Sequence, residues 1–149
     1  MKFDLHIHSI ASKYKESDGI VDNSTIDNTS VLLDKLEENE VGLFSITDHN
    51  RFNVELYNKL DSEIKTGKYE NVKGIVAGVE FDVQIDGDMG KCHIITIFDA
   101  KNKEDNYKKI KGCIDENKLE NKEGYYTRDE YESILKKIGL DVILIACQR

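Results

Sequence analysis

Residues 41–50 have the sequence VGLFSITDHN, in which a short apolar run ends on an aspartate and a histidine. A run of this length, rich in apolar and β-branched residues, predicts a buried strand over 41–47. Catalytic groups in α/β proteins gather where a strand ends and a loop begins, because the strand holds the group while the loop admits substrate. Asp48 and His49 are therefore candidate site residues, although an isolated aspartate in this place also fits a simple turn cap.

The alternation of strand and helix patterns continues along the whole chain. KFDLHI at 2–7 predicts a strand with Phe3, Leu5 and Ile7 on one face. Further strands are expected over 72–85, 91–98 and 141–146, helices near 27–40, 54–64, 104–117 and 128–138, and a loop over 9–23. This order of elements predicts the α/β class.

Capping signals refine two of the helices. Asn53 is a candidate cap for the second helix, and Thr127 with Glu130 has the spacing of a capping box. Gly139 is expected to end the last helix.

Two further expectations concern burial and the extent of the domain. The helix near 27–40 is expected to turn Val31, Leu32 and Leu36 inward. The apolar run VILIA at 142–146 favours strands covered on both faces, as in a parallel sheet or barrel. A closed α/β barrel needs more strands than this chain supplies. We therefore expect residues 1–149 to form a single domain that is truncated at its C-terminus.

Composition narrows the functional classes. The 149 residues include 39% hydrophobic and 34% charged residues, with a formal net charge of −8, and this balance is typical of a globular domain. The negative charge argues against strong autonomous binding to nucleic acid. No apolar run is long enough for a membrane span, and no signal peptide is evident, so a cytoplasmic location is expected. The three cysteines form no CxxC pair, which argues against a disulfide framework or a zinc ribbon.

The four histidines lie at or near predicted strand ends. His6 and His8 are two apart on the first strand, so their side chains point the same way and their Cα atoms lie roughly 6.5 Å apart. Both imidazoles can then reach one metal ion or two adjacent ions, although two surface histidines on an edge strand would show the same spacing. With His49 and His93 they are expected to share one rim of the sheet.

Glu80 lies inside the apolar segment GIVAGVEFDV, at 74–83. A carboxylate there is costly to bury unless it is paired or bound to a metal, and the alternative is that it faces solvent together with Asp82. A two-residue turn at Asp86 and Gly87 places Glu80 directly opposite His93 on the returning strand. Cross-strand partners have Cβ atoms about 4.5–5.5 Å apart, close enough to share a metal. A longer loop through Gly90 would shift this register.

These segments together resemble the PHP (polymerase and histidinol phosphatase) family. The matching segments are HIHS at 6–9, SDG at 17–19, TDHN at 47–50, GVE at 78–80 and the strand beginning at His93. The resemblance implies a partial, distorted (β/α)7 barrel of the PHP type that lacks its C-terminal strands. It also implies two or three divalent ions (zinc, manganese or iron) at the C-terminal ends of the strands.

The resemblance also assigns roles to individual residues. His6 and His8 resemble ligands of one metal, Glu80 a bridging carboxylate and His93 a ligand of a second metal. Asp18 and His49 resemble ligands of a third metal, with Asp48 as a catalytic or supporting carboxylate. Arg51 and Lys91, close to these motifs, are candidate phosphate contacts, and either also fits a solvated surface cation.

The sequence departs from the family pattern in two places. Cys147 follows the last strand where comparable members usually carry a histidine ligand. A thiolate can bind zinc or iron, and a small buried cysteine that is no ligand fits equally well. The late Asp-x-His motif of the family would lie beyond Arg149.

The favoured hypothesis is a metal-dependent phosphoesterase that hydrolyses a phosphate mono- or diester through a metal-activated water. Its substrate would be a phosphorylated small molecule or a nucleotide. The alternative is a truncated or degenerate, non-catalytic metal-binding module of a larger PHP–ATPase or nucleic-acid-processing protein. The chain itself contains no Walker-type glycine loop and no basic patch.

Overall fold

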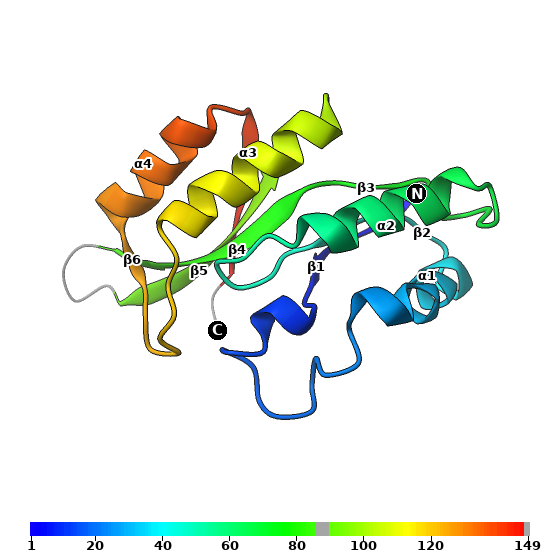
Figure 1. The fold of residues 1–149 in the computed structure, drawn as a ribbon, viewed down its shortest axis with the longest axis horizontal. Helices are drawn as coiled ribbons and strands as arrows, with labels where there is room; N and C mark the ends of the chain where they lie inside the picture. Colours follow the sequence, from blue (N-terminus) through cyan, green and yellow to red (C-terminus); the bar gives the residue numbers. More distant parts are fainter. Residues whose placement is uncertain (86–89, 148–149) are drawn as a thin grey trace.

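The computed structural model describes residues 1–85 and 90–147, apart from the side chain of Cys147, and shows a mixed α/β fold of two sheets. The parallel sheet has the order β1–β2–β3, with strands Lys2–Ile7, Val41–Ile46 and Gly74–Ile75. The mixed sheet has the order β6–β4–β5–β7, with strands Tyr126–Thr127, Gly78–Gln84, Lys91–Phe98 and Val142–Cys147. Within the described ranges the sheets do not close into a barrel (Figure 1).

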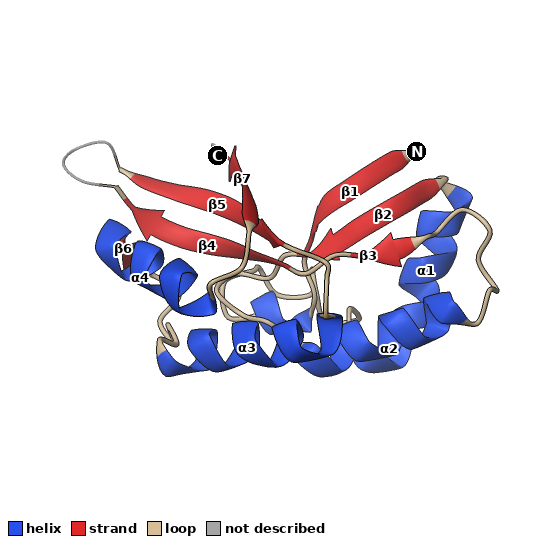
Figure 2. Ribbon diagram, turned by 90° about the horizontal axis from the view of Figure 1, so that it is seen from above, coloured by secondary structure: helices blue, strands red, loops and turns tan. Residues whose placement is uncertain are grey.

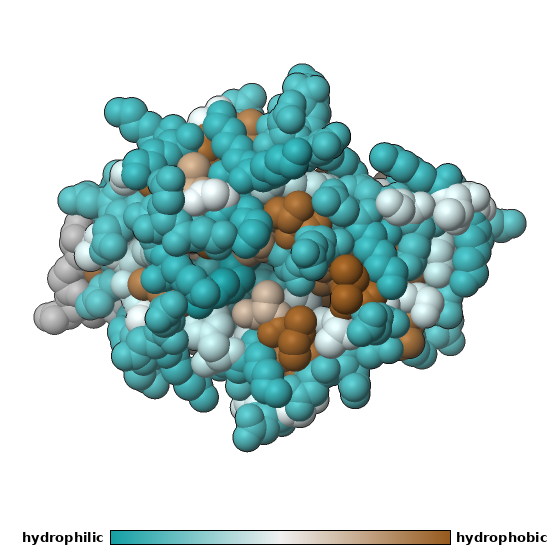
Figure 3. Space-filling view, viewed as in Figure 1, coloured by the Kyte–Doolittle hydropathy of each residue, from teal (hydrophilic) through white to brown (hydrophobic). Residues whose placement is uncertain are grey.

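In the described part of the chain, four α-helices cover one side of these sheets. They are α1 at Thr29–Glu38, α2 at Val54–Lys65, α3 at Lys103–Glu116 and α4 at Arg128–Ile138. Two short 3₁₀ helices, η1 at Ile10–Ser12 and η2 at Ile26–Asn28, lie in the segment between β1 and α1. Figure 2 shows the helices below the strands, with β1 and β7 extending away from them on the other side. The face that carries the helices is mostly hydrophilic, as Figure 3 shows.

The core lies between the helices and the sheets. Phe44 and Val79 are fully buried on the strand side, and Leu60, Ile110 and Ile134 are buried on the helix side. Burial of each large apolar side chain stabilises the fold by about 1.5–3 kcal/mol, so this single core accounts for much of the folding free energy. No helix in the described part of the chain is long and apolar enough to cross a membrane.

The expected caps are confirmed. The side chain of Asn53 accepts a hydrogen bond from the backbone N–H of Leu56 at the start of α2. Thr127 and Glu130 form a reciprocal capping box on α4, and Gly139 ends that helix in the left-handed conformation with φ 65°. Glycine adopts this backbone conformation without steric cost because it has no Cβ, which explains its place at the helix end.

The two sheets are joined where β2 and β4 meet. His49 and Glu80 form an isolated parallel bridge. In the same place Asn50 donates its backbone N–H to the carbonyl of Glu80 at 2.9 Å, and Glu80 donates to the carbonyl of Asp48 at 3.1 Å. The segment after β2 is thereby fixed against the middle of β4.

Three expectations about these elements are wrong. The segment 72–85 is not one strand, because β3 pairs with β2 whereas β4 pairs with β5. Val31 is 61% exposed, because it lies about 140° around the helix from Leu36, whereas Leu36 is buried and Leu32 packs against the core as expected. The run VILIA is not covered on both faces: β7 pairs antiparallel with β5, and Ile143 is 67% exposed.

The register of the β4–β5 hairpin also differs from the expectation. His93 lies opposite Asp82, and Glu80 lies opposite Ile95. The expected two-residue turn falls on residues 86–89, outside the described residues. A shift of two residues keeps every side chain on its expected face, because side chains along a strand alternate with a period of two.

Candidate metal centre

The four histidines gather at the ends of three strands. His6 and His8 come from the end of β1, His49 follows β2, and His93 lies near the start of β5. The ring centroids lie 4.8 Å apart for His6 and His8, 4.6 Å for His8 and His49, and 5.5 Å for His49 and His93. The imidazoles thus form a continuous series, in which each ring contacts the next.

Glu80 reaches all four of these rings. Its Oε2 lies 2.7 Å from His8 Nε2, 3.7 Å from His49 Nε2 and 3.8 Å from His6 Nε2. Its Oε1 lies 3.0 Å from His93 Nδ1. The side chain is buried, so the alternative in which it faces solvent does not hold.

Asp82 is a second buried carboxylate of the same face of β4, and its two oxygens have different partners. Oδ1 lies 3.1 Å from His49 Nδ1 and 2.5 Å from His93 Nδ1. Oδ2 accepts from Asn50 Nδ2 at 2.8 Å and from Lys15 Nζ at 2.9 Å. Lys15 and Asn50 therefore fix the carboxylate so that its other oxygen faces the histidines.

Asn50 forms the turn that follows β2 and connects it to β4 through hydrogen bonds. It is buried with φ 52°, a left-handed conformation that asparagine tolerates better than most residues. Its side-chain oxygen accepts from the backbone N–H of Asp82, and its amide donates to Tyr14 Oη and to Asp82. The turn at Asn50 thus locks the β2 end to β4.

Glu16 is the third carboxylate that contacts the histidines. Its Oε1 lies 2.5 Å from His8 Nδ1 and 3.2 Å from His49 Nε2. Asp18, the expected ligand from this loop, is exposed and belongs to none of the candidate metal groups among the described residues. The structure brings Glu16 to the histidines in its place.

The electrostatics of the centre follow from this mixture of charges. Burial alone would lower the pKa of His8, but Glu80 and Glu16 outweigh burial and raise it. Burial alone would raise the pKa of Glu80 and of Asp82, but their histidine contacts, and for Asp82 also Lys15, lower it. The carboxylates are therefore held in the charged form that binds cations.

The donor set fits a metal ion. Among the residues that the structure describes, three groups have ligand atoms that all lie within 4.8 Å of one another: His49, Glu80, Asp82 and His93; His6, His8 and Glu80; and His8, Glu16 and His49. Nδ1 of His93 is buried and lacks a hydrogen bond, although it lies close to oxygens of both Glu80 and Asp82. A cation between these atoms would satisfy the buried nitrogen. Imidazole nitrogens with carboxylate oxygens suit zinc, manganese or iron.

Asp48, expected as a catalytic or supporting carboxylate, lies buried among hydrogen-bond donors of Ser9 and Ser12. Its Oδ1 accepts from the Ser9 backbone N–H at 2.6 Å and from Ser12 Oγ at 2.7 Å, and its Oδ2 accepts from Ser9 Oγ at 2.6 Å. Ser12 Oγ accepts in turn from the backbone N–H of His49. Burial raises the pKa of Asp48, and these hydrogen bonds oppose the shift. The carboxylate holds the turn after β1 against the turn after β2.

The remaining candidates lie around this centre. Arg51 donates to the carbonyls of Asn50 and Leu119 and stacks over the ring of Tyr14. Lys91 is exposed, with its Nζ 4.4 Å from the centroid of the Tyr125 ring. The backbone of Cys147 pairs with that of His93. Its side chain lies outside the described part of the structure.

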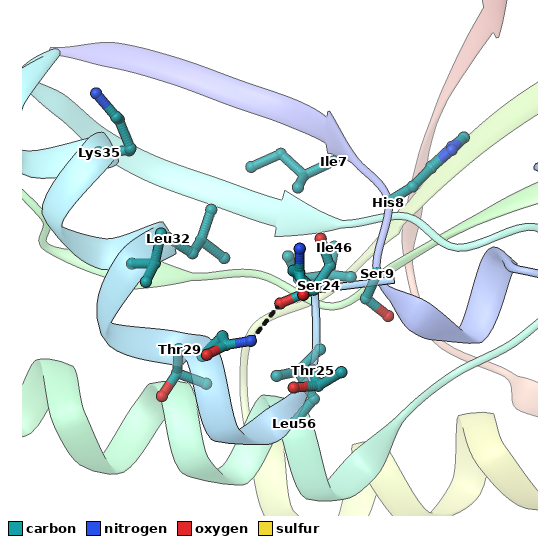
Figure 4. Close-up of a pocket in the computed structure, with 13 residues that line it drawn as sticks. Ile7, His8, Ser9, Ser24, Thr25, Thr29, Leu32, Lys35, Ile46 and Leu56 are labelled. Atoms are coloured by element: carbon teal, nitrogen blue, oxygen red, sulfur yellow. Dashed lines mark hydrogen bonds between the residues drawn. The ribbon is translucent and has the colours of Figure 1, made fainter. Parts of the chain in front are cut away.

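A cavity of about 230 Å³ lies beside the centre, between the end of β1, the start of α1 and the segment 23–29. Ile7, Leu32 and Ile46 form apolar parts of its wall. In Figure 4 the ring of His8 points away from the other labelled residues of the wall, and it contacts the rings of His6 and His49. The cavity and the metal groups therefore adjoin at His8, which belongs to both.

Comparisons with solved structures reveal distant likenesses. No protein-family model and no curated protein matches the sequence. Among solved structures, an amidohydrolase from Chromobacterium violaceum, whose structure contains sulfate and no metal, shares 19% identity at a TM-score of 0.38. The match covers 93% of this chain and 51% of the amidohydrolase chain, so this chain spans about half the length of that protein. Similarity of this degree carries no argument about activity.

Sequence reasoning missed Glu16, Lys15 and the inward direction of Asp82. Asp82 had a signal, since its spacing of two from Glu80 places both side chains on one face. Glu16 and Lys15 lie in a loop, where no periodicity indicates direction.

Proposed function

We propose that this protein is a metal-dependent phosphoesterase. The observation that carries the proposal is the position of Glu80, which contacts all four histidines from a buried place on β4. A buried carboxylate shared by several imidazoles is the arrangement that a bridging ligand of two cations requires. The preference for phosphate esters rests on the resemblance of the HIHS, TDHN and GVE segments to the PHP family. The same resemblance supports the proposal that the two open sheets correspond to part of a distorted α/β barrel.

The candidate ligands divide into groups that share members. His49, Glu80, Asp82 and His93 would hold one cation, and His6 and His8 would hold a second together with Glu80. Glu16 offers a further carboxylate between His8 and His49, where a third cation would fit. Divalent cations at such a centre supply Lewis acidity, which neutralises phosphate charge and makes water nucleophilic at neutral pH.

Other residues of the chain would orient these ligands and the substrate. Asn50 holds Asp82 in place, and Asp48 holds the turn that precedes His49. Lys91 is an exposed cation that we assign to the phosphate of a substrate. Arg51 is bound to backbone carbonyls, so we assign it a contact with the outer part of a substrate at most.

Metal removal and replacement test the proposal. Purified protein is treated with a chelator, and hydrolysis of p-nitrophenyl phosphate and bis-p-nitrophenyl phosphate is measured before and after addition of manganese, zinc or iron. We expect activity to disappear on removal and to return with at least one of the metals. Activity that is unchanged after complete removal would refute the proposal.

A pair of glutamate variants gives the matched control. Glu80→Gln keeps the shape of the side chain but removes the shared charge, and we expect it to lose metal binding and activity. Glu38→Gln makes the same change at an exposed ion pair with Lys35 and is expected to behave like the wild type. Stoichiometric metal without hydrolysis of either ester would favour the alternative of a non-catalytic metal-binding module.

A further inference from the structure

Lys15 is buried beside the candidate metal centre and contacts one of its carboxylates. Its side chain is 7% exposed, and its Nζ lies 2.9 Å from Asp82 Oδ2. The same ammonium donates to the carbonyl of Gly124 at 2.8 Å and lies 4.4 Å from the centroid of the Tyr125 ring. A lysine is rarely buried unless a charge partner compensates it, and here that partner is a candidate metal ligand.

The position of Lys15 matters because of the negative charge that the centre concentrates. Three buried or half-buried carboxylates, from Glu16, Glu80 and Asp82, face the same series of histidines. Without a cation, like charges at this separation repel one another in a poorly solvated place. The ammonium of Lys15 lies on the outer oxygen of Asp82, so it balances part of this charge without entering the space between the histidines.

We propose that Lys15 is a built-in counter-ion of the metal centre, which stabilises the metal-free protein and weakens the binding of cations. The inference rests on the proposed metal site but not on the phosphoesterase reaction. When no cation is bound, Lys15 compensates the buried charge of Asp82. When a divalent cation is bound, Asp82 has a second positive partner, and Lys15 repels that partner.

This role makes a prediction that a merely structural role does not. If Lys15 only fastened its loop to Gly124, its loss would destabilise the metal-free and metal-bound protein equally. A counter-ion stabilises the protein chiefly when no metal is bound, because the carboxylates then have no other cation beside them. Its loss should therefore lower the melting temperature strongly in chelator and only weakly in saturating metal, and it should tighten metal binding.

The test compares three substitutions in the full chain. Lys15→Met removes the charge and keeps the length of the side chain, Lys15→Arg keeps the charge, and Lys13→Met removes the charge of an exposed ion pair with Asp22. Melting temperatures are measured in chelator and in saturating Mn²⁺, and Mn²⁺ affinity is measured by titration calorimetry.

For Lys15→Met we expect a fall of about 10 °C in chelator, a much smaller fall with Mn²⁺, and Mn²⁺ binding tighter by about tenfold. For Lys15→Arg, the difference in melting temperature between chelator and Mn²⁺ should be closer to that of the wild type. Lys13→Met should match the wild type in melting temperature and in Mn²⁺ affinity. If Lys15→Met is unfolded in chelator, folding on addition of Mn²⁺ supports the proposal, and failure to fold contradicts it.

Two results would overturn the inference. Equal falls in melting temperature with and without Mn²⁺ would show that Lys15 only fastens the loop. Weaker Mn²⁺ binding by Lys15→Met would show that the lysine supports the cation instead of opposing it. A wild-type protein that neither binds Mn²⁺ nor gains stability from it would instead refute the metal site itself, whereas a protein that binds metal without hydrolysing esters leaves the counter-ion test intact.

Discussion

The hydroxyl of Tyr57 joins the two sheets just ahead of the metal centre, and its removal gives a sharp test of the fold. Tyr57 lies on α2 and is 1% exposed. Its hydroxyl donates to the carbonyl of Ile46 at 2.6 Å and accepts from the backbone N–H groups of Gly78 at 3.1 Å and Ile46 at 3.2 Å. Ile46 ends β2 and Gly78 begins β4, so one oxygen atom connects the strands that carry His49 and Glu80.

The expected cost of Tyr57→Phe follows from these partners. The substitution keeps the ring, which stacks on Phe52 with centroids 4.5 Å apart, so it opens no large cavity. Burial raises the pKa of Tyr57, so the lost group is a neutral hydroxyl that both donates and accepts. Buried backbone groups that lose a partner cost about 1–3 kcal/mol each, and with partial compensation the sum is about 3 kcal/mol. For a domain of this size, that loss lowers the melting temperature by about 6–12 °C.

Urea denaturation in chelator measures this loss, with Tyr69→Phe as the matched control. The hydroxyl of Tyr69 donates to the exposed carboxylate of Asp34 at 3.3 Å, so its removal should cost less than about 1 kcal/mol. Because the hydrogen bonds of the Tyr57 hydroxyl also set the distance between β2 and β4, Tyr57→Phe should weaken Mn²⁺ binding as well. Equal free energies of unfolding for the two variants would refute the reasoning that this hydroxyl joins the sheets.

Three smaller predictions concern other fixed points of the fold. Asp48→Asn removes an accepting oxygen from the buried turn ahead of His49 and should cost about 2 kcal/mol in urea denaturation; a loss below about 0.5 kcal/mol would contradict its anchoring role. Glu37 accepts backbone N–H groups of 70–72, which outweigh desolvation and lower its pKa below the ordinary value of 4.5. The stabilising effect of the Glu37 carboxylate is therefore present above pH 4.5 and is lost as the pH falls through the lowered pKa. Glu37→Gln should flatten the acid side of a curve of melting temperature against pH. An unchanged curve would contradict this role of Glu37. Thr127→Ala breaks the capping box and should lower the free energy of unfolding by about 1 kcal/mol, whereas Ser133→Ala on the same helix should not.

Elements with strong local signals could be predicted closely from the sequence. The strand at Lys2–Ile7 and the helix at Arg128–Ile138 have the expected bounds. Both depend on short-range physics, namely alternation of side chains along a strand and a cap at each end of a helix. The strand–helix alternation likewise gave the α/β class.

Properties that depend on distant parts of the chain could not be predicted in this way. Successive residues of a helix turn by about 100°, so Val31 does not share a face with Leu36, and packing against the sheet decides which face of α1 turns inward. The apolar run in β7 is compatible with burial or exposure, because hydrophobicity alone does not say which neighbour covers a strand. The hairpin register depends on the loop between β4 and β5, which no periodicity fixes.

The loop after β1 shows most clearly why part of the site escapes prediction. Tyr14, Lys15 and Glu16 are consecutive, yet they contact three different partners: the carbonyl of His49, the carboxylate of Asp82 and the ring of His8. In a loop, neighbouring side chains point in unrelated directions, so a motif such as SDG at 17–19 does not tell which carboxylate turns inward. The strands indicate the site residues more clearly, because a carboxylate or imidazole buried on a strand must have a partner of opposite charge or a hydrogen-bond partner. A search for the remaining ligands of such a centre is therefore better started from the buried strand groups that need a partner than from the acidic residues of a loop.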